Sequence, residues 1–521
     1  MAHRPIRRRT VLLGAAAAAA ATQLPKAAQA EAYPVFNIKT DFGALGNGVA
    51  NDSAAFRAAK AAVVAAGGGT LDIPAGVYIV GEETAGVGAS GTAYYKSADI
   101  FNITAADSVD FLHIRGTAGA VLRLKAGLHY GAFFPIGHAS AGQAYHAPGA
   151  FTTASYAAEI GWMIGVIAGG EIIIEDLELD GNNDQLVIGG RHGNVDIQLK
   201  ATGIRLLQNA DVTITDVYTH HHGLDGLTLG WGGLTTSDPL KPHVVTRVRS
   251  EYNGRQGLSW TGGNSLTVTD SQFNHTGRGA IQSLPKAGLD IEAESSITRN
   301  GYFNNCEFVN NVGEGVNCTT GDSGYTRFEG CTFWGTTNFS AYTSKPGLVF
   351  KWCNFHGQAN VGYGDPNDAL TTKYAACLFE DREWTNGQVF RDGYLIADAG
   401  PVGDNVRYTD CTFRALEVRS VWTAIPTGTT PVRHFIHCTF EHRYTGVADL
   451  GLQWHGWGSR LVGCGFTEAM GTTTNRYYIN LNDVVVDASP NGVPTTVSGP
   501  KVRWGNPTTG LTGTIPVGPY G

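Results

Sequence analysis

The sequence predicts an all-β solenoid, in which the chain winds through parallel coils stacked along one axis and a helix covers the first coil. A phrase similar to Gly-Leu-Asp recurs four times between residues 220 and 317, and each copy begins an expected strand. Farther along, cysteines recur in a fixed aromatic setting at separations of 22 to 34 residues, as is typical of solenoids. A helix-forming segment near the N-terminus is the third observation, because the open end of a solenoid needs a cap.

The composition favours a single long domain. Charged residues make up 16% of the 521 residues, against roughly 25% in an average globular protein, and glycine occurs 70 times. Low charge and frequent glycine suit a long, thin core with many tight turns. The net charge of −8 is spread over the chain without a basic patch, so we expect neither a nucleic-acid nor a membrane partner.

Residues 1–30 are predicted to be an export signal rather than part of the fold. Arg7-Arg8-Arg9 precedes an alanine-rich apolar run, and Ala28-Gln29-Ala30 offers small residues for cleavage. The segment resembles a twin-arginine signal, which exports proteins already folded. The alternative, a transmembrane anchor, suits the short run less well. We therefore expect a secreted or periplasmic protein.

The predicted cap lies directly after this signal. Asp52 or Ser53 is a suitable N-cap, residues 54–66 are rich in helix formers, and Gly67-Gly68-Gly69 ends the helix. Residues 70–78 then read as a strand and a turn. This helix is expected to cover the first coil of the solenoid.

Residues 37–56 resemble the opening of the pectate lyase-like superfamily, which includes polygalacturonases, rhamnogalacturonases, polysaccharide lyases, epimerases and phage tailspikes. The resemblance implies a single-stranded right-handed parallel β-helix over residues 31–487, with its capping segment at 37–80. Residues 488–521, rich in Pro, Gly, Thr and Ser, are expected to form a loosely packed C-terminal segment. A shared fold does not specify the reaction.

The cysteines are expected to be structural. Seven of the eight have an aromatic residue or leucine three positions before them and phenylalanine two positions after them: Cys306, Cys331, Cys353, Cys377, Cys411, Cys438 and Cys464. They would stack as small buried groups, one per coil. We expect neither disulfides nor metal binding from them, despite the export signal.

Two interruptions of the coil pattern are candidate walls of a cleft. The first, at residues 122–169, carries Tyr130 and further aromatic and histidine side chains that could stack on sugars, or could simply pack on the flank. The second lies at residues 357–406.

One strand carries the densest group of candidate catalytic residues. Side chains alternate in a β-strand, so Asp290, Glu292 and Glu294 should point outward, with neighbours roughly 7 Å apart. Stacking would add Asp225 two coils earlier and Asn317 one coil later. Crowded carboxylates raise at least one pKa, and glycoside hydrolysis needs one protonated acid beside one ionised carboxylate. We predict Asp225, Asp290 and Glu292 as catalytic; a Ca²⁺ site or a plain acidic surface are the alternatives.

A second set of polar residues comes before the outward columns and predicts substrate contacts. Together with Glu294, the predicted substrate-binding residues are His221, His222, Arg255, Lys286 and Glu314. No metal site is predicted, because adjacent histidines were expected to point in different directions and further ligands at metal spacing are not evident.

The predicted function is a secreted glycoside hydrolase that uses paired carboxylates on a polysaccharide or oligosaccharide. A polysaccharide lyase acting by β-elimination on a uronate polymer is the second hypothesis, with Lys286, Arg255 or His221 as base or charge neutraliser. No cofactor is expected for a hydrolase, whereas a lyase could use Ca²⁺. A non-catalytic glycan-binding protein is the third. The aspartate pair, Asn-Thr-Asp and Arg-Ile-Lys motifs of polygalacturonases are absent, so no roles are transferred from them.

Overall fold

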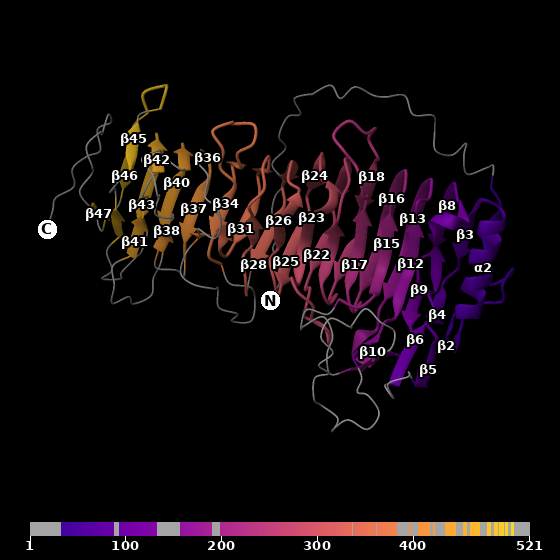
Figure 1. Ribbon diagram of the computed structural model, residues 1–521. Helices are drawn as coiled ribbons and strands as arrows, with labels where there is room; N and C mark the ends of the chain where they lie inside the picture. The colour runs from indigo at the N-terminus through magenta and orange to yellow at the C-terminus, as the bar shows by residue number, and fades with distance from the viewer. Residues whose placement is uncertain are drawn as a thin grey trace.

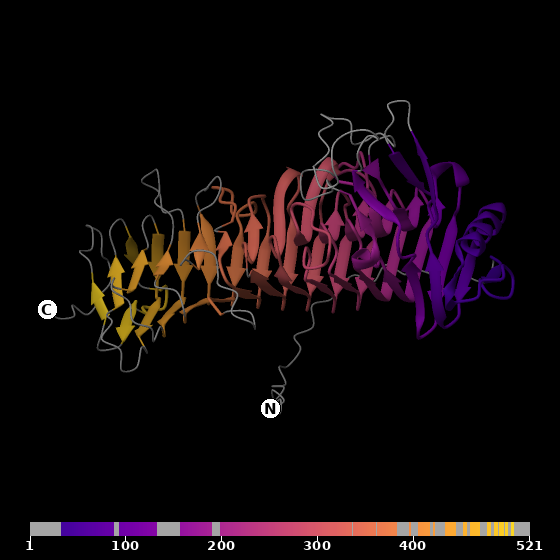
Figure 2. The same cartoon turned by 90° about the horizontal axis from the view of Figure 1, so that it is seen from below.

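The chain forms an elongated right-handed parallel β-helix, as predicted (Figures 1 and 2). The structure is a computed structural model that describes residues 33–504 except 88–92, 133–156, 190–197, 336, 361, 383–394, 398–404, 417–419, 423–432, 444–451, 456–458, 469–476, 481–483, 488, 494 and 499–501. The predicted export signal lies outside the described residues. Within them, no helix has the length and apolar character needed to cross a membrane.

Each complete coil contains three strands. In one coil, β18 (His243–Thr246) and β19 (Arg249–Glu251) meet at a corner, and β20 (Gln256–Trp260) follows on the other face. The next coil repeats the order with β21 (Leu266–Thr269), β22 (Gln272–Asn274) and β23 (Ala287–Ile297), each parallel to its counterpart. The coils therefore stack in register, which places equivalent residues in columns.

The strands that carry the candidate site form one ten-stranded parallel sheet, here called the site sheet. Its strands in spatial order are β7 (Phe101–Ile103), β12 (Gly161–Ile167), β15 (Ala201–Leu207), β17 (Asp225–Gly230), β20, β23, β26 (Val316–Asp322), β29 (Ala341–Thr343), β32 (Ala359–Asn360) and β35 (Ile396–Ala397). The first two strands of each coil belong to a larger sheet, which includes the long strands β13 (Glu171–Asp180) and β16 (Asp211–His220).

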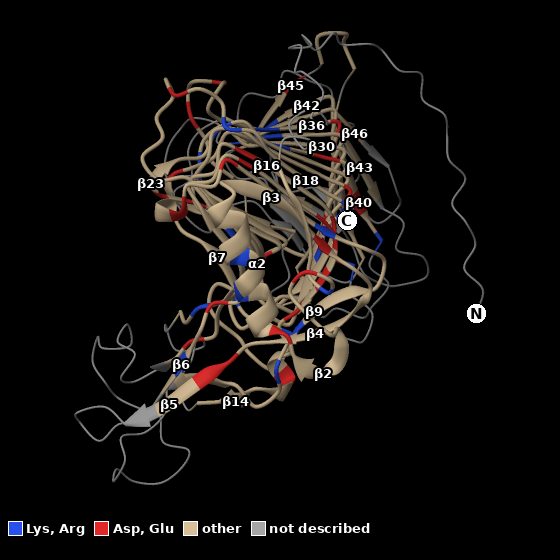
Figure 3. Ribbon diagram, turned by 90° about the vertical axis from the view of Figure 1, so that its right-hand side faces the viewer, with Lys and Arg blue, Asp and Glu red and all other residues tan. Residues whose placement is uncertain are grey.

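Helix α2 (Ser53–Ala65) covers the N-terminal end of the solenoid, as predicted (Figure 3). Its apolar face, including Phe56 and Val63, is buried. Asp52 is the N-cap residue, but its carboxylate accepts hydrogen bonds from the backbone N–H groups of Leu45 (2.7 Å) and Gly46 (3.0 Å). The aspartate therefore ties the preceding turn to the cap instead of binding the helix N-terminus.

The C-terminal half of the core is a double column of aromatic rings with a column of cysteines beside it. Phe350, for example, stacks on Phe328 and Tyr374 with centroids 4.9 and 5.0 Å apart. All eight cysteines are free and buried, and the Cys353 thiol contacts the Phe328 carbonyl oxygen at 3.5 Å. The predicted structural role of the cysteines is confirmed.

The structure corrects the register of the first Gly-Leu-Asp phrase. Leu227 of β17 pairs with Leu258 of β20, whereas Asp225 lies opposite Gln256. The copy that aligns with the later coils is Gly226–Thr228, three residues farther along, because Leu227 is the residue that enters the core. Asp225 therefore belongs to a different column from Asp290; the three later copies align with one another as predicted.

Two further segments differ from the sequence prediction: β10 (His129–Ala132), and the strands β46 (Thr496–Ser498) and β47 (Val502–Trp504), which pair in parallel with β43 (Gly465–Glu468) and β44 (Tyr477–Asn480). Tyr130 in β10 is buried, and its hydroxyl donates to the carbonyl oxygens of Leu199 (3.0 Å) and Gly223 (3.2 Å), so it is not a sugar-stacking ring. Phe133, Phe134, His138, Tyr145 and His146 of that interruption lie outside the described residues. Strands β46 and β47 lie within the predicted C-terminal segment 488–521.

Candidate active site

The candidate site lies on the outer face of the site sheet, where β17, β20 and β23 run side by side. In-register pairing places Ser259 and Asn317 on either side of Asp290. Strand β23 continues past Asp290 with Glu292 and Glu294 at successive outward positions. The alternation predicted for this strand is confirmed, because Leu289 and Ile291 are fully buried in the core.

Asp225 and Arg255 form a buried ion pair. Arg255 donates from Nε and Nη2 to the two carboxylate oxygens at 2.7 and 2.8 Å, and Thr228 Oγ1 donates to Asp225 at 2.8 Å. Asp225 is 1% exposed and Arg255 9%. Burial alone would lower the pKa of Arg255, but the charge of Asp225 outweighs this effect and raises the guanidinium pKa above its ordinary value. Arg255 is thus a permanent cation in this site, and it cannot act as a base.

Asp290 and Glu292 form a coupled pair of carboxyl groups. Asp290 is fully buried and accepts hydrogen bonds from Gln256 Nε2 (2.5 Å) and Asn317 Nδ2 (2.9 Å). Burial, followed by the charge of Glu292, raises the pKa of Asp290 well above its ordinary value. Burial also raises the pKa of Glu292, against the attraction of Arg255.

The two carboxyl groups are hydrogen-bonded to one another, so they lie closer than the roughly 7 Å expected from strand geometry. Asp290 and Glu292 therefore act as one acid–base unit that holds a proton. Glu292 is the accessible member of the pair, because its side chain is partly exposed whereas Asp290 is fully buried.

A pocket of about 470 Å³ opens on the same sheet and reaches β23 at Glu294, whereas Asp290 and Glu292 are not among its lining residues. It is lined by aromatic, cationic and acidic side chains, including Trp162, Lys200, Arg205, Asp225, Trp231, Arg255 and Glu294. The Arg205 guanidinium lies 4.2 Å from the centre of the Trp162 ring, and Lys200 Nζ lies 5.5 Å from it. Flat rings and charged groups in one open pocket can bind a polar ring with charged substituents.

Several predicted substrate-binding residues lie elsewhere. His222 is 1% exposed, and burial lowers its pKa to about 3, so it is a neutral core residue and not a surface contact. Lys286 donates to Gln282 at 3.1 Å, and Glu314 accepts from Asn338 at 2.7 Å. Neither Lys286, Glu314 nor His221 lines the pocket, whereas Arg255 and Glu294 do.

Four aromatic or cationic pocket residues are missing from the sequence prediction: Trp162, Lys200, Arg205 and Trp231. The first three lie on or beside β12 and β15, ahead of the stretch with the repeated phrase. The available sequence signal is alternation along these strands. Arg205, for example, lies between the core residues Ile204 and Leu206 and therefore points outward.

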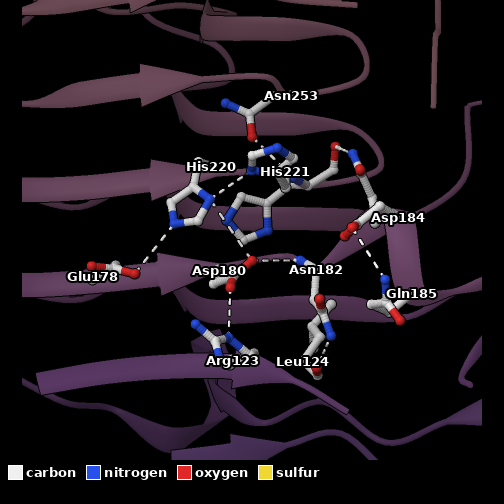
Figure 4. A network of polar contacts seen from close by, with 12 residues as sticks. Arg123, Leu124, Glu178, Asp180, Asn182, Asp184, Gln185, His220, His221 and Asn253 are labelled. Atoms are coloured by element: carbon white, nitrogen blue, oxygen red, sulfur yellow. Dashed lines mark hydrogen bonds and ion pairs between the residues drawn. The ribbon is translucent and has the colours of Figure 1, made fainter. Parts of the chain in front are cut away.

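The structure also corrects the orientation expected for the histidine run. His220 Nδ1 and His221 Nδ1 lie 2.7 Å apart, and His220 Nδ1 lies 3.7 Å from Asp180 Oδ1 (Figure 4). One ligand atom from each of these three residues lies within 4.8 Å of the others. The adjacent histidines converge because His221 adopts a left-handed backbone conformation, with φ of +55°. Among the described residues, this is the group that could hold a metal ion.

Comparisons with known proteins agree with the fold. A family model described as "Right handed beta helix region" matches residues 163–333. Two mannuronan C5-epimerases of Azotobacter vinelandii, AlgE5 and AlgE4, are 60% identical over 50 residues and 58% over 45 residues. Each match covers 9% of this chain and 5% or 8% of the relative, so the chain spans only a small part of these curated proteins.

Solved structures resemble the chain over most of its length at low identity. The A-module of AlgE4 from Azotobacter vinelandii is 16% identical, with 90% of this chain and all of that chain covered and a TM-score of 0.35. The tailspike protein gp49 of Pseudomonas phage LKA1 is 13% identical, with 91% and 82% covered and a TM-score of 0.37.

Proposed function

We propose that this protein is a carbohydrate-active enzyme that acts on a polysaccharide, and that it is a glycoside hydrolase with Glu292 as proton donor. The observation that carries the proposal is the Asp290–Glu292 pair, because burial raises both pKa values and the pair keeps a proton to a higher pH than exposed carboxyl groups do. Glu294, the next outward residue on the same strand, lines a pocket with two tryptophans and several charged groups. The predicted export signal agrees with an extracellular polymer as substrate.

In this mechanism Asp290 positions Glu292 and shares its proton. Asp290 is held by Gln256 and Asn317, so the hydrogen bond between the two carboxyl groups fixes the orientation of Glu292. Glu292 would donate its proton to the leaving-group oxygen as the glycosidic bond breaks. The buried partner keeps the acid protonated until the transition state draws the proton away.

Glu294 is the proposed second carboxylate. It lines the pocket and is exposed, one outward position beyond Glu292. Inverting enzymes use two carboxyl groups about 6.5–9.5 Å apart, of which the second is the base that activates a water. Asp225, predicted as catalytic, is assigned instead to positioning Arg255, because both its oxygens are bound by that guanidinium.

The lining of the pocket favours an acidic sugar. Lys200, Arg205 and Arg255 contribute three cations, against two carboxylates from Asp225 and Glu294. Asp225 and Arg255 neutralise one another, which leaves Lys200 and Arg205 against Glu294 in the lining; Lys200 Nζ also lies 3.6 Å from Glu159 Oε2, which does not line the pocket. The local sequence match to mannuronan C5-epimerases, whose substrate is a uronate polymer, points in the same direction.

The same cations support a second candidate, a lyase that cleaves a uronate polymer by β-elimination. Arg255 would neutralise the uronate carboxylate. Arg205 would add a second cation beside Arg255, because it also lines the pocket.

A panel of uronate and neutral polysaccharides separates these reactions when reducing ends and ultraviolet absorbance are measured together. A hydrolase releases reducing ends without new absorbance, whereas a lyase adds the absorbance of a C4–C5 double bond in step with them. Glu292→Gln should lower hydrolysis by roughly 10²- to 10⁴-fold. Asp176→Asn is the matched control and should be fully active, because Asp176 lies at an exposed corner of β13 with a left-handed backbone conformation. Unchanged hydrolysis in Glu292→Gln refutes the proposed acid, and binding without any cleavage identifies a glycan-binding protein.

A further inference from the structure

A second cluster of chemically active side chains lies outside the proposed active site, at the end of two neighbouring strands of the larger sheet. Asp180 ends β13 and His220 ends β16, and the two are direct partners in the parallel ladder. Neighbouring strands are about 4.8 Å apart, so their side chains on the same face meet. Both residues are buried, at 7% and 8% exposure.

The backbone brings a third ligand to the same point. Consecutive residues in an extended strand face opposite ways, but the left-handed conformation of His221 turns its side chain back toward that of His220. The two Nδ1 atoms lie 2.7 Å apart, and Asp180 Oδ1 lies 3.7 Å from His220 Nδ1. Figure 4 shows both imidazole rings and the Asp180 carboxylate facing one another.

All three side chains are held in place by neighbours. Glu178 Oε1 lies 3.4 Å from the second ring nitrogen of His220, and the His221 ring stacks on Tyr252 with centroids 5.0 Å apart. Asp180 accepts the Asn182 backbone N–H on Oδ1 at 2.8 Å and Arg123 Nε on Oδ2 at 2.7 Å. A carboxylate on the far nitrogen of a histidine is the usual support of a metal-binding imidazole, since it fixes the tautomer.

We propose that Asp180, His220 and His221 bind a divalent transition-metal ion, with Zn²⁺ as the best fit. With metal–nitrogen bonds of about 2.0–2.1 Å, two nitrogens at the observed separation subtend an angle of roughly 80°, and Asp180 Oδ1 sits at roughly 130° from His220. Small side-chain rotations bring these angles to a tetrahedral site with water as fourth ligand. Two imidazoles and one carboxylate suit zinc, whereas Ca²⁺ and Mg²⁺ prefer oxygen ligands alone.

Metal binding changes the hydrogen bonding but needs no other reactant. Without metal, a proton lies between the two Nδ1 atoms, because two lone pairs at 2.7 Å would repel. With metal, both Nδ1 atoms become ligands, and each neutral ring carries its proton on Nε2. The proton of His220 then faces Glu178, the carboxylate already placed at that nitrogen. The ion would fix the corner between β16 and β17, and so the start of the strand that carries Asp225.

The test is a direct measurement of metal binding to tag-free protein stripped with a chelator. Isothermal titration with Zn²⁺ should show one tight site per chain, which excess Ca²⁺ does not occupy. Co²⁺ substitution should give the visible absorption of a four-coordinate nitrogen and oxygen site. His220→Ala and His221→Ala should each weaken zinc binding at least tenfold. Circular dichroism checks the fold of both variants. If His220→Ala does not fold, the zinc affinity of His221→Ala decides the test, because His221 is the more exposed residue.

His113→Ala is the matched control. His113 Nε2 lies 2.8 Å from Glu175 Oε1, and within the described part of the chain this pair belongs to no three-ligand group. The control should bind zinc like the wild type. Equal zinc affinity in the wild type and in folded His221→Ala, or no tight site in the wild type, overturns the proposal. Because the measurement does not use catalysis, its result is independent of the proposed hydrolase activity.

Discussion

The Asp225–Arg255 ion pair gives the sharpest test of the energetics of the site. Arg255→Met keeps a long side chain but removes both hydrogen bonds to Asp225. The carboxylate is 1% exposed, so water cannot replace the lost donors, and Thr228 remains as donor from the protein. The variant therefore contains a buried charge without its counter-ion.

The expected loss in the free energy of unfolding is about 3–5 kcal/mol, the range found when one partner of a buried ion pair is removed. The double variant Asp225→Asn/Arg255→Met should recover much of this loss, because it removes both charges together. Arg247→Met is the matched control. Arg247 also binds both oxygens of an aspartate, Asp216, at 2.7 and 2.6 Å, but this pair is exposed and its loss should have no measurable effect.

Urea unfolding at neutral pH, followed by tryptophan fluorescence, measures the three variants against the wild type. Solenoid coils can open locally, so hydrogen exchange of peptides covering β17 and β20 should accompany it and show faster exchange in Arg255→Met. If Arg255→Met is as stable as Arg247→Met, or if the double variant is as unstable as the single one, the reasoning from burial and charge is wrong.

Three further predictions concern the acid–base pair, the core and the pocket. Because the pKa of Asp290 is raised in the folded state, the native protein holds a proton that the unfolded chain has lost. The stability contributed by this proton should fall as pH rises above about 4. Asp290→Asn should lessen the fall in melting temperature between pH 4 and 8. Phe350→Ala should cost about 3–5 kcal/mol in urea unfolding, while the exposed Trp352→Ala costs far less; equal losses would contradict the stacked core. Trp162→Ala should raise KM for the identified polysaccharide roughly three- to tenfold with little change in kcat, and an unchanged KM would remove Trp162 from the binding surface.

Local signals allowed much of the fold to be predicted from the sequence. The capping helix depends on consecutive helix formers and a terminal glycine, and the cysteine column depends on a phrase repeated at each coil. The register of the first Gly-Leu-Asp copy, on β17, could not be predicted in this way. Gly223-Leu224 and Gly226-Leu227 both match the repeat, and packing of Leu227 against the neighbouring core residues decides between them.

Three of the predicted site residues lie on one strand, β23, while Asp225 and Arg255 come from the two coils before it. Alternation along β23 identified Asp290, Glu292 and Glu294, but not the direct contact of the first two, which depends on side-chain rotamers and burial. Trp162 and Arg205 come from earlier coils, so sequence distance hides their place in the pocket. The convergence of two histidines depends on a single backbone angle, that of His221, which residue type does not reveal.

The in-register stacking of coils gives the outer surface of this protein a regular spacing along the solenoid axis. Each coil advances the outer surface by about 4.8 Å, so side chains from successive coils lie at fixed steps along any polymer that follows the axis. The gain or loss of a whole coil would shift all residues beyond it by one step and leave the local chemistry of each strand intact. Substrate length and binding chemistry can therefore evolve separately, one by coil number and the other by substitutions at outward positions.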